Sequence, residues 1–339
     1  MARKRTVAFS ANAVNLFFHI LTGCNLKCRH CYINPAQHGT AALPLETIER
    51  WLGIFADLGK PMNLVLLGGE PTLHPDLAAV VKAARRMQFT SITIDTNGYL
   101  FHDILDRISP EELDYFSFSL DGATAQTNDA LRGQGSYTAC LEGVRRTVAR
   151  GFSTSMIYTV STANIDELEE MGPLLEDLGV ERFFIQVLGI RGNPARQAHS
   201  GTPQRPLQVD RARWLAVVPA AAERIANHGL TVSYPKVFLE AKEAFICAAR
   251  VAENFFIFPN GRVYRCPLCE DFPLHSYTLE NDRLEPMPAI NEKELFALDI
   301  PEGCVMNRLV QPGNLIYNRD GSPAYQIACC MLKEEILPP

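Results

Sequence analysis

The sequence predicts an α/β fold built on a parallel sheet. Between Val14 and about residue 190, short β-rich runs alternate with amphipathic segments of helical period. Strict alternation of this kind favours a parallel sheet with right-handed crossovers. Six strands are too few to close an eight-stranded barrel. The predicted strands are Val14–Leu21, Asn63–Leu67, Ser91–Asp95, Tyr115–Leu120, Thr154–Val160 and Arg182–Leu188, and the helices between them are Leu45–Leu58, Asp76–Met87, Ile104–Ile108, Tyr137–Arg150 and Ile165–Leu178.

Composition and charge exclude several classes of protein. The chain has 339 residues, 47% of them hydrophobic, which suffices for one large domain and a smaller one. A net charge of −6 offers no basic field for nucleic acid or an anionic membrane. No apolar run approaches the ~20 residues of a membrane span, and no export signal is present, so we expect a cytoplasmic protein. We interpret the basic start, Met1 to Arg5, as a solvated tail.

The ten cysteines are distributed as metal ligands would be. Three lie near the N-terminus, six fall in the last 93 residues, and Cys140 stands alone between them on the apolar face of a predicted helix. A chain of this size needs no disulfide framework, and clustered cysteines in a reducing compartment more often bind metal. We expect Cys140 to be a core residue.

The N-terminal set, Cys24, Cys28 and Cys31, has the spacing C-x3-C-x2-C directly after the first predicted strand. Three thiolates can hold three irons of a [4Fe–4S] cube and leave the fourth iron open, as a catalytic site requires. A zinc site with His30 or His38 as fourth ligand is the alternative.

This motif resembles the signature of the radical SAM superfamily. The resemblance implies a partial (β/α)6 TIM-like barrel, splayed open for substrate, and S-adenosylmethionine (SAM) bound to the open iron of a [4Fe–4S] cluster. It also implies an electron from a flavodoxin- or ferredoxin-type donor. Reductive cleavage of SAM would then yield methionine and a 5′-deoxyadenosyl radical that abstracts hydrogen from a substrate.

Polar residues at three predicted strand ends match the SAM-binding elements of that family. Gly68, Gly69 and Glu70 resemble the GGEP element that receives the SAM amino group, where glycines permit close approach. The resemblance further implies contacts to the SAM ribose and carboxylate from Asn97, Ser119, Asp121 and Arg132. For Arg132, a guanidinium suits a carboxylate, but a surface arginine at a helix start is the alternative. His30 replaces the Tyr or Phe that many members place near the adenine.

A second metal site is predicted in the C-terminal region. An Asn-Gly turn between two apolar runs predicts a hairpin that brings Cys247 and Cys266 together. The pattern resembles the start of a SPASM or twitch domain, but the continuation C-x2-C-x5-C-x3-C is missing. We therefore expect one auxiliary [4Fe–4S] cluster; a zinc site or a free catalytic thiol are the alternatives. The expected ligands are Cys247, Cys266, Cys304 and Cys329, with Cys269 and Cys330 as alternates.

These features suggest two domains. Residues 1–235 would form the radical SAM core, and residues 236–339 a small cysteine-rich α+β auxiliary domain. The Pro/Gly-rich stretch 191–209, with its three arginines, is either a lid whose arginine meets a substrate carboxylate or a linker. About 13 residues precede the first predicted strand, so we expect no leader-peptide-binding domain there.

The expected function is that of a radical SAM enzyme, and the substrate is left open. Oxidative modification of a peptide or protein residue, or of a small metabolite, is the main hypothesis. The run from Cys24 to Tyr32 also resembles tetrapyrrole-modifying members, so a decarboxylase or dehydrogenase of tetrapyrrole or other cofactor biosynthesis is the alternative. An iron–sulfur carrier or electron-transfer protein would lack the strand-end motifs at Gly68 and Asp121, which are present here.

Overall fold

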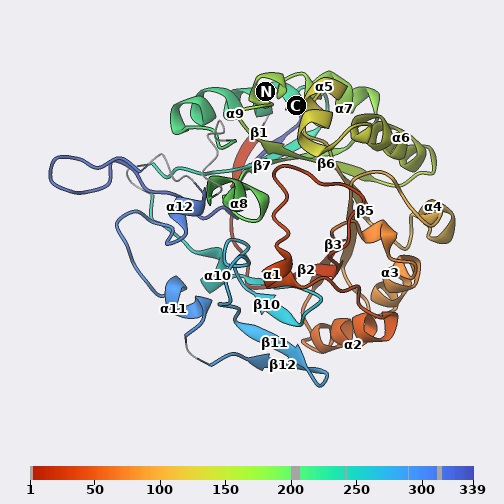
Figure 1. The fold of residues 1–339 in the computed structure, drawn as a ribbon. Coiled ribbons are helices and arrows are strands. Elements are labelled where there is room, and N and C mark those ends of the chain that lie inside the picture. Colours follow the sequence, from red (N-terminus) through yellow and green to blue (C-terminus); the bar gives the residue numbers. More distant parts are fainter. Residues whose placement is uncertain (1–2, 200–206, 241–242, 289, 311–314) are drawn as a thin grey trace.

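One curved sheet organises the molecule. The computed structural model describes residues 3–199, 207–240, 243–288, 290–310 and 315–339. Helices cover the outer side of the sheet, which bends into an open barrel (Figure 1). The strands are β1 (Arg3–Val7), β2 (Val14–Leu21), β3 (Met62–Gly68), β4 (Ser91–Thr96), β5 (Tyr115–Ser119), β6 (Thr154–Val160), β7 (Arg182–Val187), β8 (Thr231–Pro235), β9 (Glu253–Ile257), β10 (Arg262–Tyr264), β11 (Tyr277–Glu280), β12 (Arg283–Pro286) and β13 (Lys333–Leu337).

The predicted α/β architecture is confirmed. The strand order is β1-β13-β8-β7-β6-β5-β4-β3-β2-β9-β10-β11-β12, with β1 and β12 at the two edges, so the barrel is not closed. Strands β2 to β7 pair in parallel, each with its neighbour in sequence, as a (β/α)6 unit requires. Two further parallel strands extend this unit, β8 beside β7 and β9 beside β2.

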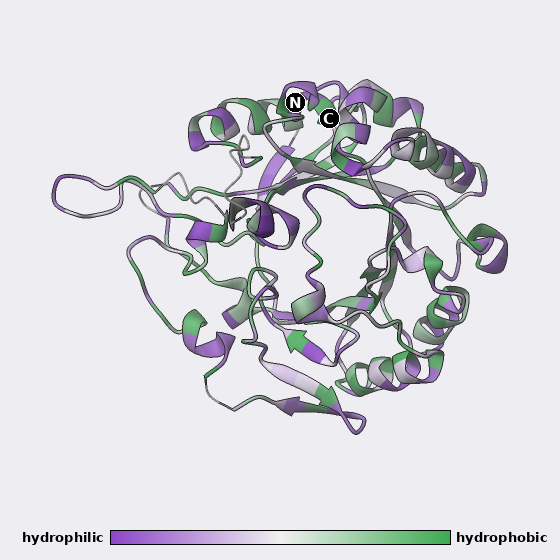
Figure 2. Cartoon of the chain, in the orientation of Figure 1, coloured by the Kyte–Doolittle hydropathy of each residue, from purple (hydrophilic) through white to green (hydrophobic). Residues whose placement is uncertain are grey.

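The longest helices form the outer layer of the barrel (Figure 1). The described helices are α1 (Pro35–His38), α2 (Leu45–Ala56), α3 (Leu77–Arg86), α4 (Ile104–Arg107), α5 (Ala125–Arg132), α6 (Ser136–Ala149), α7 (Met171–Asp177), α8 (Asn193–His199), α9 (Arg211–Ala226), α10 (Ala248–Val251), α11 (Glu292–Phe296) and α12 (Asn307–Val310). In α2, Ile48, Trp51, Leu52 and Phe55 are spaced by one helical turn and buried, so one face packs inward. Figure 2 shows this amphipathicity, because the outer helices carry both hydrophilic and hydrophobic residues. None of the described helices is long and apolar enough to cross a membrane.

Alternation along β4 shows how the strands separate two environments. Ile92 and Ile94 are fully buried in the core cluster beneath the helices. Ser91, Thr93 and Asp95 point to the opposite face, which is only half-buried. That second face is the inner face of the barrel, and polar side chains on it are available for function.

The N-terminal tail and one helix differ from the prediction. The prediction of a solvated tail at residues 1–5 is half right for residues 3–5: they are exposed to solvent, but they are not a free tail, because Arg3–Val7 forms β1 and pairs antiparallel with β13. The partner strand lies at the other end of the chain, so no local pattern reveals it. The predicted helix Ile165–Leu178 is split into a 3-10 turn, Ile165–Glu167, and α7. Pro173 falls in the first turn of α7, where a missing N–H is tolerated.

The cysteine-rich region shares the barrel's sheet. The predicted hairpin is confirmed, since β9 pairs antiparallel with β10 and Gly261 adopts a φ of 82° in the turn. Strand β9 also pairs with β2, the strand that precedes the N-terminal cysteine loop. This pairing brings the two cysteine regions to neighbouring parts of one sheet, across the proposed boundary between residues 235 and 236.

Candidate active site

The three N-terminal cysteines lie in the loop between β2 and α1, which crosses the middle of the ring of strands in the view of Figure 1. Other segments hold this loop through its backbone. The Arg29 N–H donates to the Leu131 carbonyl at 2.9 Å, and the Asn193 N–H donates to the Cys31 carbonyl at 2.8 Å. The Asn193 side chain donates to the Cys28 carbonyl at 2.7 Å. Because these hydrogen bonds to the backbone hold the loop in place, the position of the loop does not depend on its three thiols.

Burial and nearby charges act on these three thiols in opposite directions. Burial raises the pKa of all three, to about 11 for Cys24, and neighbouring thiols add to the rise for Cys24 and Cys28. For Cys28 and Cys31 the Arg132 guanidinium opposes this rise in pKa. Three thiolates in one loop repel one another, and bound iron would offset that repulsion. The residues present therefore fit an iron–sulfur cluster.

The two histidines of the zinc alternative have other partners. His30 Nε2 lies 3.0 Å from a carboxylate oxygen of Asp121. Both ring nitrogens of His38 are used, one by the Glu270 carbonyl and one by the Asn34 N–H, each at 3.0 Å. Among the described residues no three His, Cys, Asp or Glu side chains converge closely enough for a single metal ion. That finding concerns single ions, whereas a four-iron cluster takes its thiolates at separate corners.

The two glycines of the GGEP element let the cysteine loop pack against β3. A Cβ atom on Gly68 would lie 2.3 Å from the Leu21 carbonyl oxygen, and one on Gly69 would lie 2.1 Å from the Gly23 carbonyl oxygen. The Gly69 N–H donates to Leu21 and the Glu70 N–H to Gly23, at 3.0 and 2.9 Å. Only glycine fits these contacts, which position the loop just ahead of Cys24.

The Glu70 carboxylate joins the ends of β3 and β4. Its Oε1 atom accepts hydrogen bonds from the Thr72 N–H (3.0 Å), the Thr72 hydroxyl (2.6 Å) and the Thr96 hydroxyl (2.8 Å). Its Oε2 atom accepts one, from the Asn97 N–H at 2.7 Å. Burial raises the pKa of Glu70, and these donors oppose the rise. Oε2 of Glu70 is therefore the oxygen that can still accept a hydrogen bond from a ligand ammonium.

Asn97 contacts the cysteine loop, whereas Ser119 contacts Cys140 on α6. The Asn97 side-chain amide donates to the Asn25 Oδ1 atom at 2.8 Å and lies 3.8 Å from the Cys24 sulfur. Ser119 ends β5 and is half-buried, and its carbonyl oxygen lies 3.7 Å from the Cys140 sulfur. Cys140 is 1% exposed, which confirms it as a core residue.

Asp121, Arg132 and His30 form a buried network that the sequence did not reveal. Asp121 Oδ2 contacts both the Arg132 Nε and the His30 Nε2 atoms, and Oδ1 accepts from the Thr159 N–H at 2.6 Å. Burial raises the pKa of Asp121, but Arg132 and His30 outweigh it and hold the pKa below its ordinary value. Arg132 ends α5 and is 8% exposed, so the alternative of a surface arginine at a helix start is wrong.

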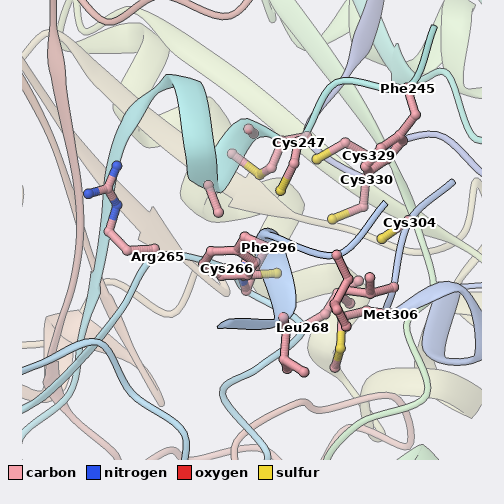
Figure 3. A pocket seen from close by; sticks show the side chains of 17 residues that line it. Phe245, Cys247, Arg265, Cys266, Leu268, Phe296, Cys304, Met306, Cys329 and Cys330 are labelled. Carbon is pink, nitrogen blue, oxygen red and sulfur yellow. The ribbon is translucent and has the colours of Figure 1, made fainter. Parts of the chain in front are cut away.

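The C-terminal cysteines converge on one cavity with apolar walls, shown in Figure 3. It spans about 460 Å³, part of which is open to solvent, and Leu268, Phe296 and Met306 contribute to its walls. All four expected auxiliary ligands line it, and so does one of the two alternates. The lining cysteines are Cys247, Cys266, Cys304, Cys329 and Cys330.

Cys269, the other alternate, lies beside this cavity. It is fully buried, and its thiol interacts with Cys266 and Glu292, which together with burial raises its pKa. The Glu292 carboxylate also accepts from the Arg265 N–H at 2.6 Å and the Cys266 N–H at 3.2 Å. These bonds fix the backbone that presents Cys266 to the cavity.

Arg191 connects the two cysteine regions. Its guanidinium lies over the Tyr32 ring, 4.4 Å from the centroid, and forms an ion pair with Glu270. The next residue, Gly192, donates its N–H to Asp271 at 2.7 Å. Since Tyr32 follows Cys31 and Glu270 follows Cys269, this contact joins both cysteine segments. Of the arginines in the proposed lid, Arg191 is therefore paired with a residue of the protein itself, Glu270. Arg205 lies outside the described residues.

Comparisons with known proteins agree with this geometry. Residues 18–174 match the family model of the Radical SAM superfamily. Pre-heme d1 synthase of Dinoroseobacter shibae is 36% identical over 192 residues, which cover 53% of this chain and 45% of that protein. Mycofactocin maturase MftC of Mycobacterium ulcerans is 26% identical over 292 residues, 79% of this chain and 71% of the maturase. The chain spans about half the length of the first curated relatives that it matches.

Solved structures share the fold. Streptococcus suis SuiB bound to its precursor peptide SuiA aligns with a TM-score of 0.67 at 13% identity, covering 89% of this chain and 71% of SuiB. Such coverage includes much of the cysteine-rich C-terminal region. A three-cysteine loop lies at the carboxyl ends of an open parallel barrel. Residues 18–174 of the chain are thus similar to the radical SAM superfamily, and the molecule shares its fold with SuiB.

Proposed function

We propose that this protein is a radical SAM enzyme whose [4Fe–4S] cluster is held by Cys24, Cys28 and Cys31. The observation that carries the proposal is the packing of the cysteine loop directly on the Gly68-Gly69 end of β3. When bound, cluster and SAM supply a reducing electron and a 5′-deoxyadenosyl radical that removes hydrogen from a substrate carbon. The protein's own contribution is to bind and orient SAM and the substrate, and to exclude water.

The residues around the loop have distinct tasks in this proposal. Glu70 would accept the SAM ammonium at Oε2, the oxygen that accepts one hydrogen bond within the protein. Asn97 would bind SAM next to the cysteine loop, where its amide already contacts Asn25. Asp121 would hold Arg132 toward the SAM carboxylate, while Ser119 at the end of β5 would bind the ribose.

An auxiliary cluster in the C-terminal cavity is part of the same proposal. Four thiolates complete a [4Fe–4S] cluster, and the cavity offers five. We keep Cys247, Cys266, Cys304 and Cys329 as ligands, with Cys330 and Cys269 as alternates. The cavity wall of leucine, phenylalanine and methionine would shield such a cluster from water. Residues 236–339 would then be the auxiliary domain and residues 1–235 the core.

The substrate is a peptide residue or a small metabolite that undergoes oxidative modification. The name of the maturase MftC and the peptide-bound SuiB structure support the first class. A second candidate is a step of tetrapyrrole or other cofactor biosynthesis, which the identity of 36% to pre-heme d1 synthase supports. For either class of substrate, the electron donor would be a flavodoxin- or ferredoxin-type protein. A reducing cytoplasm would keep the thiols reduced and able to bind the clusters.

Iron content and low-temperature EPR of anaerobically reconstituted, dithionite-reduced protein test the proposal, with and without SAM. About eight irons per chain, with one of two cluster signals changed by SAM, is the expected result. About four irons and the same change would leave the core function and reject the auxiliary cluster. The absence of any SAM-sensitive signal would reject the proposed function.

A further inference from the structure

A lysine that follows the auxiliary cysteines reaches the inner face of the barrel. Lys333 begins β13, three residues after Cys330, and pairs with Pro235 of β8. Its ammonium lies over the ring of Phe184 on β7, 5.3 Å from the centroid. Lys333 is half-buried rather than exposed. This placement turns a positive charge away from bulk solvent.

Strand register places Asp95 on the same face of the sheet. Asp95 is paired with Ser117 on β5, and Ser117 with Ser155 on β6. Two residues along β6, Ile157 is paired with Phe184, over which Lys333 lies. Residues paired across parallel strands, and those two apart within a strand, share a face. Asp95 and Lys333 therefore both belong to the inner face.

The Lys333 ammonium and the Asp95 carboxylate both lack a close ion-pair partner among the described residues. Within the part of the chain that the structure describes, Lys333 forms no ion pair and donates no hydrogen bond. Burial and the Glu70 charge raise the pKa of Asp95, while Ser117 and the Lys333 charge oppose the rise. Among the residues that the structure describes, Asp95 nevertheless forms no ion pair within 4.0 Å. A half-buried ammonium without a counter-ion is costly, so a ligand anion would stabilise it.

Each member of the pair is close in sequence to a residue of one cysteine region. Asp95 comes two residues before Asn97, whose side-chain amide lies 3.8 Å from the Cys24 sulfur. Lys333 comes three residues after Cys330, which lines the C-terminal cavity. A substrate held by the pair would therefore be near both proposed clusters.

We propose that Lys333, together with Asp95, forms a subsite that binds a carboxylate of the substrate on the inner face of the barrel. This inference rests on the proposed function and names the substrate chemistry that its site selects. The Lys333 ammonium supplies the charge, and the Phe184 ring beside it restricts the directions from which a ligand can approach. Burial raises the pKa of Asp95 to about 7, so near neutral pH a protonated Asp95 donates a hydrogen bond to the same carboxylate.

The carboxylate can come from a tetrapyrrole propionate or from a peptide side chain, and the test distinguishes them. Reconstituted wild-type protein is acylated briefly with an amine-reactive ester, and the modification of Lys333 is quantified by mass spectrometry. Lys82, whose side chain is 44% exposed on α3, is the internal reference. The probes are coproporphyrin III and its tetramethyl ester, and the peptides Gly-Glu-Gly and Gly-Gln-Gly.

Protection by a charged probe but not by its neutral counterpart is the expected result. Labelling of Lys333 should fall about threefold when the probe is present at about twice its dissociation constant, with Lys82 unchanged. Which charged probe protects tells the source of the carboxylate. The protecting probe should also bind Lys333→Met at least about tenfold more weakly than Lys82→Met, because a charged hydrogen-bond partner is lost.

Equal labelling with charged and neutral probes, at every concentration tried, overturns the subsite. The wild-type labelling decides this even where Lys333→Met fails to fold. The EPR spectrum of the same preparation keeps the two hypotheses apart. A missing SAM-sensitive signal rejects the proposed function, whereas a normal signal without carboxylate protection rejects the subsite alone.

Discussion

The two cysteine regions bring their thiols together by opposite routes. The N-terminal set comes from eight consecutive residues, Cys24 to Cys31, in a loop near the surface where Cys24 is exposed. The C-terminal set comes from Cys247 to Cys330, and Cys304 and Cys329 are 7% and 8% exposed. The cysteines of the N-terminal set are neighbours in the sequence. Those of the C-terminal set come together only after strands and loops from four segments have packed.

This difference teaches what each region requires of the fold. The N-terminal loop needs an anchor at each end, which Gly69 and Asn193 provide through backbone hydrogen bonds. The C-terminal cavity needs the hairpin β9–β10 and the turn before β13 to be formed together. A local site should therefore be lost by changing one ligand, and an assembled site should also be sensitive to distant contacts.

The largest expected effect is that of Cys28→Ala. Two remaining thiolates cannot hold the cluster that leaves one iron open for SAM, so SAM cleavage should be abolished. Iron should fall by about four per chain, while about four remain in the C-terminal region. Product analysis for methionine and 5′-deoxyadenosine, with an iron assay, measures both.

Cys140→Ala is the control for this change, because Cys140 is a buried thiol outside both cysteine sets. It should retain both the iron and the SAM cleavage. Cleavage by Cys28→Ala at the wild-type rate would remove the N-terminal loop from the proposed chemistry.

The next effect is that of replacing Cys247 and Cys266 together with alanine. Both line the C-terminal cavity, so about four irons per chain should be lost. The EPR signal that responds to SAM should remain, because the hydrogen bonds that anchor the N-terminal loop at Gly69 and Asn193 involve neither of these cysteines. Unchanged iron content would contradict the auxiliary cluster, and about one zinc per wild-type chain in place of four irons would make the cavity a zinc site.

The parts of this architecture that could be predicted from the sequence are those with a local pattern. Alternating β and α periods specified β2 to β7, and the Asn260-Gly261 turn specified the β9–β10 hairpin. The same reasoning recovered the cysteines that share the cavity, because their residue type alone carries the chemistry. It could not rank Cys329 against Cys330, since both adjacent thiols line the cavity.

Long-range partners set the limit of that prediction. Arg191 and Glu270 are 79 residues apart, and the Pro/Gly-rich run after Arg191 suggests a loop rather than a buried ion pair. The pairing of β1 with β13 joins the two ends of the chain in the same way. The contact between His30 and Asp121, which are 91 positions apart, likewise has no local signal in the sequence.

The smallest of the three effects is on stability, and it tests whether the two regions are coupled. Arg191→Met would leave Glu270, whose side chain is 2% exposed, without its partner. Breaking a buried ion pair on one side costs about 3 kcal/mol of unfolding free energy, which denaturant titration of the reconstituted protein measures. Because Gly192 and Asn193 bond to Asp271 and Cys31, the amides of both should also exchange hydrogen faster.

Two comparisons separate coupling from general damage. Arg50→Met breaks the exposed pair with Asp282 and should cost less than about 1 kcal/mol, without changing exchange near the cysteines. Combining Arg191→Met with Glu270→Leu removes the buried charge as well, and should restore much of the lost stability. If Arg191→Met instead behaves like Arg50→Met, the Arg191–Glu270 ion pair contributes little stability, and other contacts between the two regions, such as the pairing of β9 with β2, hold them in place.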